Sequence, residues 1–312
     1  MSRDDIEDIY HNIELFNSDV ASPLLSAGDR VVYGADDRKD IYQLSGNDIE
    51  ARQKQLVYST VILTEKSNVS KNADGTWTLD VAPFTRNGHR PCSSERFGHQ
   101  HVGGWCSGFM VGHDVIATAG HCGKTQQKIE DTAYIFGFHA ISETDKGQVI
   151  FQENQVYFGK ELIAHDLSPT GDFAIVRVDR SISSPGARIL PVRTSGVPTI
   201  GGHLGVIGYP SGLPVKIAFG VQTVLIRDDD PWLIGNLDTY GGNSGSPVFN
   251  AEGMVEGILV RGARDYVLDG NCFRTNFLSI ATGGEAITRA SVFCDKIPST
   301  DQPDAGCGDI DE

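Results

Sequence analysis

Short apolar runs broken by turn residues fill most of the chain from residue 59 to residue 261. β-branched and aromatic residues are frequent in these runs, and clusters of Gly, Pro, Asn and Asp separate them, a pattern that predicts strands joined by tight turns. The runs are TWTLDV, SGFMV, DVIATA, TAYIFGF, FAIVRV, LGVIGY, QTVLI, SPVF and MVEGILV. Because no helical periodicity intervenes between them, we predict an all-β fold, either a barrel or a sandwich.

Helical patterns occur at two places near the ends of this region. NDIEARQKQ, residues 47–55, predicts a short helix. FLSIATGGEAITRA, residues 277–290, predicts a short C-terminal helix, although its two adjacent glycines weaken the pattern.

The two ends of the chain differ in composition from the domain between them, residues 58–290. Residues 1–57 are charged and poor in long apolar runs, and EARQKQLVYST offers a basic, polar stretch to a processing protease. We expect these residues to be either a pro-segment, which would make the chain a zymogen, or a retained extension packed on the core. The tail, residues 291–312, is rich in Pro, Gly and Asp, and we expect it to be mobile unless Cys307 anchors it.

Charge excludes one class of partner. The chain has 312 residues and a formal net charge of -15, and it has no segment rich in Lys and Arg. Such a surface repels phosphate backbones, so we expect no nucleic-acid partner. No apolar run is long enough to cross a membrane, and the acidic start MSRDDIEDIYHNIELF lacks the features of a signal peptide.

The six cysteines indicate an oxidising compartment, so we expect a secreted or periplasmic protein. Residues 105–122 form two β-rich runs around the turn Gly112-His113-Asp114, and folding about this turn brings Cys122 opposite Cys106. We therefore predict a Cys106–Cys122 disulfide. The other four can pair in three ways, among which the sequence does not choose: Cys92, Cys272, Cys294 and Cys307. A zinc site at Cys92, His99 and His101 is a weaker alternative, because its spacing matches no common zinc module.

Three segments carry the residue types of nucleophilic catalysis. Serine needs a base, a group that orients the base, and donors for the developing oxyanion. ATAGHC places His121 after a strand, GDFAIVRV places Asp172 at the start of one, and GGNSGSP places Ser244 in a glycine-rich turn. The glycines of this turn let the amides of Gly242 and Ser244 point at one spot, as an oxyanion hole requires.

With these residues in the order His, Asp, Ser, the sequence resembles the chymotrypsin-fold serine peptidases. Within that fold it resembles the bacterial V8-like, glutamyl-endopeptidase-type group over about residues 59–290. The matching segments are STVIL, CSGFMVGHDVIATAGHC, GDFAIVRV, GYPSGLPV, GGNSGSPVFN and EGILVRG. The resemblance implies two six-stranded antiparallel barrels that meet near residues 180–190, with the active site between them. It also implies peptide-bond hydrolysis by His121, Asp172 and Ser244 without a cofactor or metal.

Substrate preference depends on residues around Ser244. Asp238 stands where trypsin-like enzymes place the carboxylate that receives Lys or Arg, whereas Thr239 stands where glutamyl-type enzymes carry a hydroxyl for an acidic side chain. The glutamyl-type histidine is replaced by Leu259. Because a buried carboxylate attracts a cation, we predict cleavage after Arg or Lys, with the glutamyl type as the alternative.

The opposite wall of this pocket consists of Val260, Arg261 and Gly262, whose backbone would bind the substrate as an added strand. An Arg261 side chain turned inward would pair with Asp238 and admit acidic or neutral groups instead. Asn243 precedes the nucleophile, as in the V8-like group, so the activation salt bridge that trypsins make at this position is not available.

A catalytically silent binding module is the rival class. Such a module typically lacks a member of the triad, whereas this chain keeps all three residues and the turn glycines. We therefore expect an enzyme that acts on proteins or peptides, as a monomer without a membrane partner.

Overall fold

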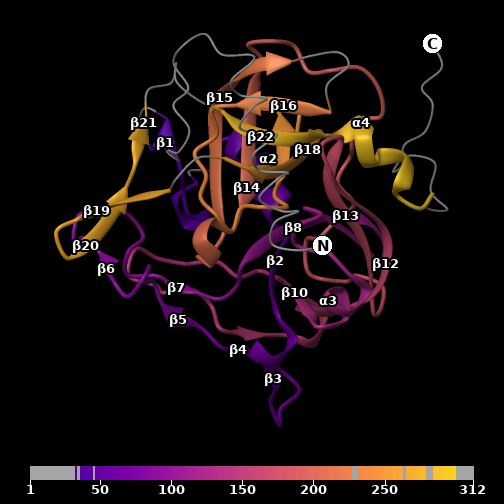
Figure 1. Ribbon diagram of the computed structural model, residues 1–312. Helices are drawn as coiled ribbons and strands as arrows, with labels where there is room; N and C mark the ends of the chain where they lie inside the picture. The colour runs from indigo at the N-terminus through magenta and orange to yellow at the C-terminus, as the bar shows by residue number, and fades with distance from the viewer. Residues whose placement is uncertain are drawn as a thin grey trace.

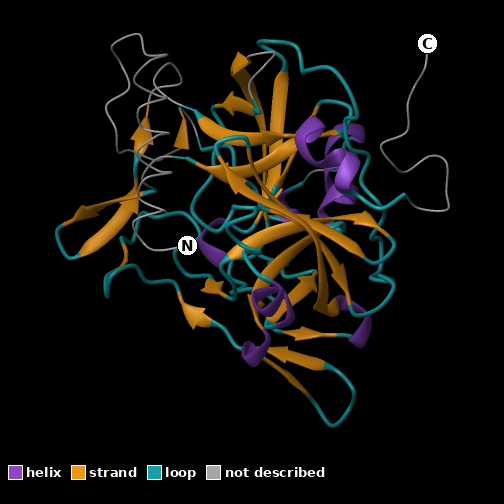
Figure 2. Cartoon of the chain, turned by 45° about the vertical axis from the view of Figure 1, so that its right-hand side comes forward, coloured by secondary structure: helices purple, strands orange, loops and turns teal. Residues whose placement is uncertain are grey.

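Strands dominate the protein, and the helices are few and short (Figure 2). The computed structural model describes residues 32–33, 36–44, 46–226, 231–262, 265–278 and 284–299. Two six-stranded sheets each close into a barrel. The all-β prediction and the two-barrel architecture implied by the resemblance are confirmed.

The first barrel takes six of the strands between residues 60 and 178. Around the barrel their order is β10 (Thr132–Phe136), β12 (Val156–Ser168), β13 (Gly171–Val178), β9 (Val115–Thr118), β8 (Cys106–Gly112) and β2 (Thr60–Glu65). Neighbouring strands run antiparallel. β8 and β9 form the predicted hairpin, and every residue of both strands is buried.

The second barrel takes six of the strands between residues 203 and 289. Their order is β14 (His203–Gly208), β15 (Lys216–Ile226), β16 (Trp232–Gly235), β22 (Glu285–Arg289), β18 (Val255–Arg261) and β17 (Pro247–Asn250). Residues 179–202 connect the barrels, so the boundary expected near 180–190 lies within this connection. In Figure 1 the second barrel, in orange, lies above the first, in magenta.

Smaller sheets and helices surround the barrels. In the described residues, two of these sheets have two strands: β1 (Val32–Tyr33) with β21 (Phe277–Leu278), and β5 (Ala82–Pro83) with β7 (His101–Val102). Two others have three strands. In one, β4 (Trp77–Leu79) lies between β11 (Ile150–Phe151) and β3 (Val69–Lys71); in the other, β20 (Cys272–Thr275) lies between β19 (Tyr266–Asp269) and β6 (Arg90–Pro91). The α-helices are α2 (Asp48–Val57), α3 (Gln126–Glu130) and α4 (Ala290–Phe293), and the 3-10 turns are Ile41–Gln43, Lys66–Asn68, Glu153–Gln155, Pro210–Gly212 and Cys294–Lys296. α2 confirms the helix predicted over residues 47–55.

The position predicted for the C-terminal helix is wrong. Glu285–Arg289 forms strand β22, which pairs with β16 on one side and β18 on the other, and the helix α4 begins only at Ala290. Two neighbouring strands offer β22 hydrogen bonds along both edges, and this tertiary pairing overrides the weak local pattern. Residues 279–283 and the tail from residue 300 lie outside the described residues.

Residues 36–57 pack closely on both barrels. Lys39 forms a backbone bridge with Ile217 of β15, and Leu56 and Val57 of α2 belong to the core. Asp40 pairs with Lys216, whose Nζ lies 2.8 Å from the Asp40 carboxylate, and both side chains are almost fully buried. Removal of residues 1–57 would therefore leave Lys216 buried without this counterion. The pro-segment stays a prediction, and residues 1–31 lie outside the described residues.

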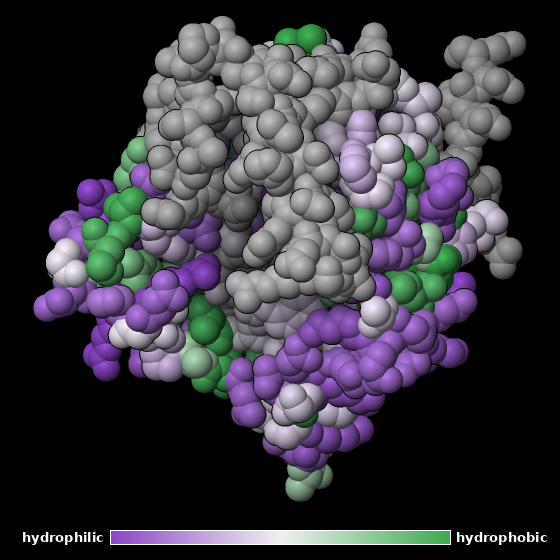
Figure 3. All heavy atoms as spheres, viewed as in Figure 1, coloured by the Kyte–Doolittle hydropathy of each residue, from purple (hydrophilic) through white to green (hydrophobic). Residues whose placement is uncertain are grey.

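Apolar packing is continuous across the two barrels. One core cluster contains Ile62 and Phe109 of the first barrel together with Ile207, Phe249 and Ile258 of the second. The face drawn in Figure 3 is mostly hydrophilic where its residues are coloured, with hydrophobic residues in small separate groups. Among the described helices, none combines the length and the apolar character needed to span a bilayer.

Candidate active site

His121 and Asp172 form a hydrogen-bonded pair on the first barrel. The Nδ1 atom of His121 lies 2.9 Å from Oδ2 of Asp172, and the backbone N–H of His121 donates to Oδ1 at 3.0 Å. Both carboxylate oxygens are thus used to hold one residue. The Asp172 side chain is 3% exposed and the His121 side chain 25%, so the imidazole stays accessible from solvent. This contact fixes the ring and leaves Nε2 available for proton transfer.

The two strands that carry this pair are neighbours. β9 ends at Thr118, three residues before His121, and Asp172 is the second residue of β13, which pairs with β9. Thr288 of the second barrel also holds Asp172: its hydroxyl accepts from the Asp172 N–H at 3.2 Å and donates to the Asp172 carbonyl at 3.0 Å. Nothing in the local sequence pointed to Thr288, because it lies 116 residues away from Asp172.

The charge of Asp172 is stabilised by its neighbours. Burial acts to raise the pKa of this carboxyl, but His121 and Arg261 outweigh burial and hold the pKa below its ordinary value. Nη2 of Arg261 lies 3.9 Å from Oδ2 of Asp172. Asp172 is therefore ionised at neutral pH and oriented toward the imidazole.

Ser244 lies in a turn that requires glycine at position 242. Gly242 has φ of 101°, and a Cβ built on it would lie 2.8 Å from both the Tyr209 carbonyl and the Ser211 N–H. The Ser107 hydroxyl donates to the Gly242 carbonyl at 2.8 Å, and the Ser107 N–H donates to the Ser244 carbonyl at 2.8 Å. β8 of the first barrel thereby anchors the turn of the second.

Two amides of this turn are not used within the described part of the chain. The N–H groups of Gly241, Asn243, Gly245 and Ser246 each donate to a protein oxygen. Those of Gly242 and Ser244 donate to none of the described acceptors. These are the two amides predicted for the oxyanion hole, and they remain free to bind an anionic oxygen.

The Ser244 hydroxyl contacts the backbone of β18. Its Oγ lies 3.5 Å from the carbonyl oxygen of Val260, at the weak limit of a hydrogen bond, and among the described residues no hydrogen bond joins it to His121. Rotation about one side-chain bond moves Oγ without any change in the backbone. Such loose contacts are common in enzymes that hold no substrate.

The structure contains the predicted Cys106–Cys122 disulfide, which links β8 to the residue after His121. A second disulfide joins Cys92 to Cys272, so of the three open pairings it selects the one that leaves Cys294 and Cys307. This bond also rules out the zinc alternative, because the Cys92 sulfur is not available as a ligand. Cys307 lies outside the described residues.

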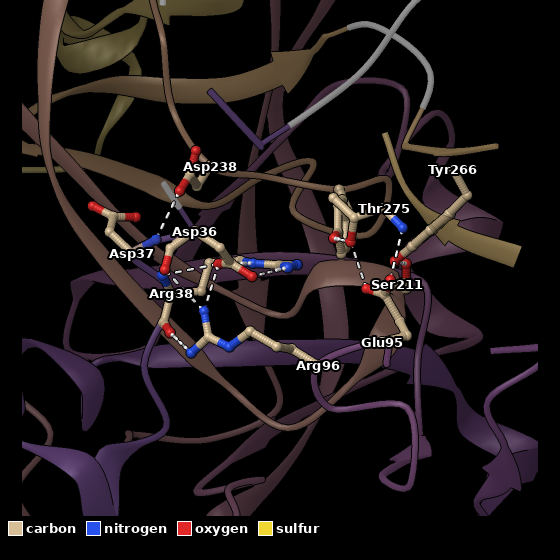
Figure 4. A network of polar contacts seen from close by, with 10 residues as sticks. Asp36, Asp37, Arg38, Glu95, Arg96, Ser211, Asp238, Tyr266 and Thr275 are labelled. Carbon is tan, nitrogen blue, oxygen red and sulfur yellow. Dashed lines mark hydrogen bonds and ion pairs between the residues drawn. The ribbon is translucent and has the colours of Figure 1, made fainter. Parts of the chain in front are cut away.

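Asp238 is 2% exposed and contacts the N-terminal segment. Its Oδ2 accepts the backbone N–H of Asp37 at 3.0 Å, a contact drawn in Figure 4. Burial and then the Asp238 carboxyl raise the pKa of Asp37, to about 8. Two carboxyl groups therefore meet at the position where the sequence predicted one. Asp37 lies 201 residues from Asp238, so no sequence pattern indicated the contact.

The segment around Asp37 is held by buried charges. The Arg38 guanidinium lies 2.7 Å from the Asp36 carboxylate and 4.0 Å from the centre of the Tyr240 ring, two residues after Asp238. Arg96 donates to the carbonyls of Asp36 and Arg38 (Figure 4), and the contact of Arg38 with Tyr240 joins the segment to the turn before Ser244.

The remaining predicted pocket residues lie on or beside β18. Val260 and Leu259 are each 2% exposed, as is Thr239. Arg261 packs over the Trp232 ring at 4.7 Å and approaches Asp172. The inward contact with Asp238, which the sequence raised as the alternative, stays a prediction.

The chain is similar to one protein family and to two curated proteins. Residues 106–258 match the model of the family described as "Trypsin-like peptidase domain". Two curated relatives are 23% identical over 185 residues, which are 52% of this chain and 69% of theirs: snake venom serine protease 1 of Craspedocephalus gramineus and snake venom serine protease PA of Trimeresurus stejnegeri.

Solved structures of similar shape include human heparin binding protein, at 16% identity and a TM-score of 0.48, covering 78% of this chain and 90% of that one. A Glu endopeptidase has 16% identity and a TM-score of 0.47, covering 86% of this chain and 97% of that one.

Proposed function

We propose that this chain, which carries a trypsin-like peptidase domain over residues 106–258, is a serine endopeptidase with Ser244 as nucleophile, His121 as general base and Asp172 as the residue that orients the base. The observation that carries the proposal is the paired contact of His121 with both oxygens of Asp172. A structural histidine has no need of two such contacts to a buried carboxylate. In a base, by contrast, the Nδ1 contact selects the tautomer and stabilises the imidazolium, while the backbone contact fixes the carboxylate.

The proposed reaction proceeds through an acyl-enzyme. Ser244 Oγ attacks the scissile carbonyl carbon while its proton passes to Nε2 of His121, and the carbonyl oxygen becomes an oxyanion. His121 then gives this proton to the leaving amine as the C–N bond breaks. A water molecule repeats the sequence on the ester and restores the hydroxyl.

The unused amides of Gly242 and Ser244 support the second part of this mechanism. An oxyanion needs preorganised donors that are not already engaged by protein acceptors. We assign the oxyanion hole to these two N–H groups. Loss of one such donor typically lowers kcat by about 10² to 10³-fold.

We further propose a preference for Arg or Lys at the P1 position. The buried carboxyl group of Asp238 supports it, because a carboxylate repels an acidic side chain and attracts a cation. Leu259 offers no donor to an acidic side chain. The glutamyl-type alternative draws on Thr239 alone, and Thr239 is 2% exposed.

Sequence motifs also support a V8-like enzyme that acts on proteins or peptides outside the cytosol. The two disulfides favour a secreted or periplasmic protein. We propose that part of the N-terminal region is a pro-segment. The buried contacts of Arg38 and Asp40 favour a cleavage point before residue 36 over the one expected near residue 57.

Labelling with a fluorophosphonate tests the proposal. We expect an adduct on Ser244, located by peptide mass spectrometry, and no adduct in denatured protein or in Ser244→Ala. Peptide hydrolysis should persist in EDTA, because no metal takes part. Ser181→Ala provides the matched control, since this exposed serine lies in the connection between the barrels. Activity that survives in Ser244→Ala would falsify the assignment.

A further inference from the structure

Glu285 is a buried carboxylate that the proposed mechanism does not use. It begins β22, and its side chain is 2% exposed. On one side Glu285 pairs with Gly235, the last residue of β16, three residues before Asp238. On the other side β22 pairs with β18, where Ala286 lies opposite Arg261. Glu285 therefore lies between the two segments that the sequence assigned to the walls of the P1 pocket.

The Glu285 carboxylate occupies the side-chain position of Gly262. A Cβ built on Gly262 would lie 1.6 Å from Oε2 of Glu285 and 2.1 Å from Oε1. Any larger residue at position 262 would therefore displace the carboxylate. Glycine at this position holds the charge directly against the backbone that is proposed to bind substrate.

Gly262 directly follows β18, the strand whose backbone contacts the proposed nucleophile Ser244. Gly262 is two residues after Val260, whose carbonyl oxygen lies 3.5 Å from Ser244 Oγ. Residues 260–262 are the backbone proposed to bind substrate as an added strand, and we place the P1 side chain of that substrate beside Gly262. The group that lines the side-chain position of Gly262 then contacts that P1 side chain.

Asp238 differs from Glu285 in the part of the protein that it contacts. One of its oxygens accepts the N–H of Asp37, and the Asp37 carboxyl lies beside it, so Asp238 is part of the contact between the N-terminal segment and the second barrel. Figure 4 shows Asp238 directed at this segment. The charge at Asp238 thus fixes the segment, whereas the charge at Glu285 borders the substrate backbone.

We propose that Glu285 is the specificity-determining residue that receives the guanidinium or ammonium group of a basic P1 side chain. The proposal rests on the proposed function, since it requires Ser244 to be the nucleophile. A cation would gain charge-assisted hydrogen bonds with Glu285 in a region shielded from water, and an acidic side chain would be repelled.

Matched peptide anilides that differ only at P1, with Arg, Lys, Gln, Leu or Glu, test the proposal on the processed enzyme. Glu285→Gln keeps the shape of the side chain and removes its charge. We expect kcat/KM for Arg and Lys to fall about 10- to 100-fold, while Gln and Leu stay within about threefold of the wild-type enzyme. Glu161→Gln, an exposed position on the first barrel, should leave all five values unchanged.

Two further measurements keep the test decisive if Glu285→Gln does not fold. Glu285→Asp retains the charge but withdraws it by one methylene, so the ratio of Arg to Lys cleavage should change at least threefold. Benzamidine, a small aromatic amidinium, should inhibit the wild-type enzyme competitively and bind Glu285→Asp more weakly.

The outcomes separate the two proposals. An unchanged preference for Arg over Gln in Glu285→Gln overturns the role of Glu285, and unchanged Arg to Lys ratios and benzamidine affinity in Glu285→Asp do the same. In both cases hydrolysis and Ser244 labelling continue. Absence of hydrolysis of every peptide, together with absence of labelling at Ser244, overturns the proposed function itself.

Discussion

The two halves of the candidate site place their carboxylates in different settings. On the first barrel, Asp172 is bound by His121 through both oxygens and lies near Arg261, so its charge is balanced by groups of the protein. On the second barrel, Asp238 and Glu285 lie in or beside the segments that we propose as the walls of the P1 pocket, with Asp37 beside Asp238. A carboxylate held in this way can orient a base, whereas an acidic group in the wall of a substrate pocket can attract a cation. We therefore propose that buried acids serve catalysis in one half and selectivity in the other.

The largest expected effect comes from Asp172→Asn. The amide can no longer hold the productive imidazole tautomer, so we expect kcat to fall about 10⁴-fold for every P1 side chain alike. Steady-state kinetics on the five anilides measure this. Asp179→Asn, at the exposed end of the same strand, is the control. A loss confined to basic substrates would mean that Asp172 acts in selectivity and that the two halves are not distinct.

Asp40→Asn tests how much the buried ion pair of Asp40 with Lys216 stabilises the protein. The variant leaves Lys216 buried without its carboxylate, and we expect the free energy of unfolding to fall by about 3–5 kcal/mol near pH 6. Burial lowers the pKa of Lys216 to about 8, and Asp40 acts against burial. Without Asp40 the lysine therefore releases its proton at a lower pH, and the loss should shrink as the pH rises toward 8.

Denaturant unfolding at pH 6 and pH 8.5 measures this difference. Asp295→Asn, in an exposed pair with Lys296, should change stability by less than about 1 kcal/mol. An equal loss at both pH values would show that Lys216 is not the group left uncompensated.

Removal of the Cys106–Cys122 disulfide tests the half of the site that carries His121. The bond closes a short loop with a sequence separation of 16, and replacement of both cysteines by alanine should cost about 3 kcal/mol. Because Cys122 follows His121, kcat should also fall. The Cys92–Cys272 double variant should lose stability with little change in kcat. If both variants lost kcat equally, proximity to His121 would not explain the effect.

Arg261→Met should give the smallest effect. The substitution keeps an apolar contact with Trp232 but removes the cation that helps to lower the pKa of Asp172. A depressed carboxyl pKa contributes stability that is present above the ordinary value of 3.8 and is lost as the pH falls through the folded-state pKa. With that depression reduced, stability should differ less between pH 7 and pH 3 than in the wild-type enzyme.

Unfolding at the two pH values measures this change, with Arg274→Met, at an exposed pair with Asp269, as the control. A pH dependence identical to that of the wild-type protein would show that the 3.9 Å approach of Arg261 has no electrostatic effect on Asp172.

Local sequence determined the strands and the candidates for catalysis. Apolar runs between turn residues correctly marked β8, β9, β13, β14, β17 and β18, because a strand and its turns are encoded within about ten residues. The hairpin turn at residues 112–114 correctly indicated the Cys106–Cys122 pair for the same reason. His121, Asp172 and Ser244 were recognisable because each stands in a short motif, and their catalytic roles remain a prediction.

Tertiary structure alone decided the substrate side of the site and the ends of the chain. The Asp37–Asp238 contact spans 201 residues, the Thr288–Asp172 contact spans 116, and Glu285 meets Gly262 only because β22 pairs with β18. Residues 285–289 became a strand rather than a helix for the same reason, since both edges of β22 find partners from distant segments. Local patterns determine which residues can form a strand or a turn. Barrel closure determines which strands become neighbours, and a pocket is lined by side chains from neighbouring strands that are distant in the sequence.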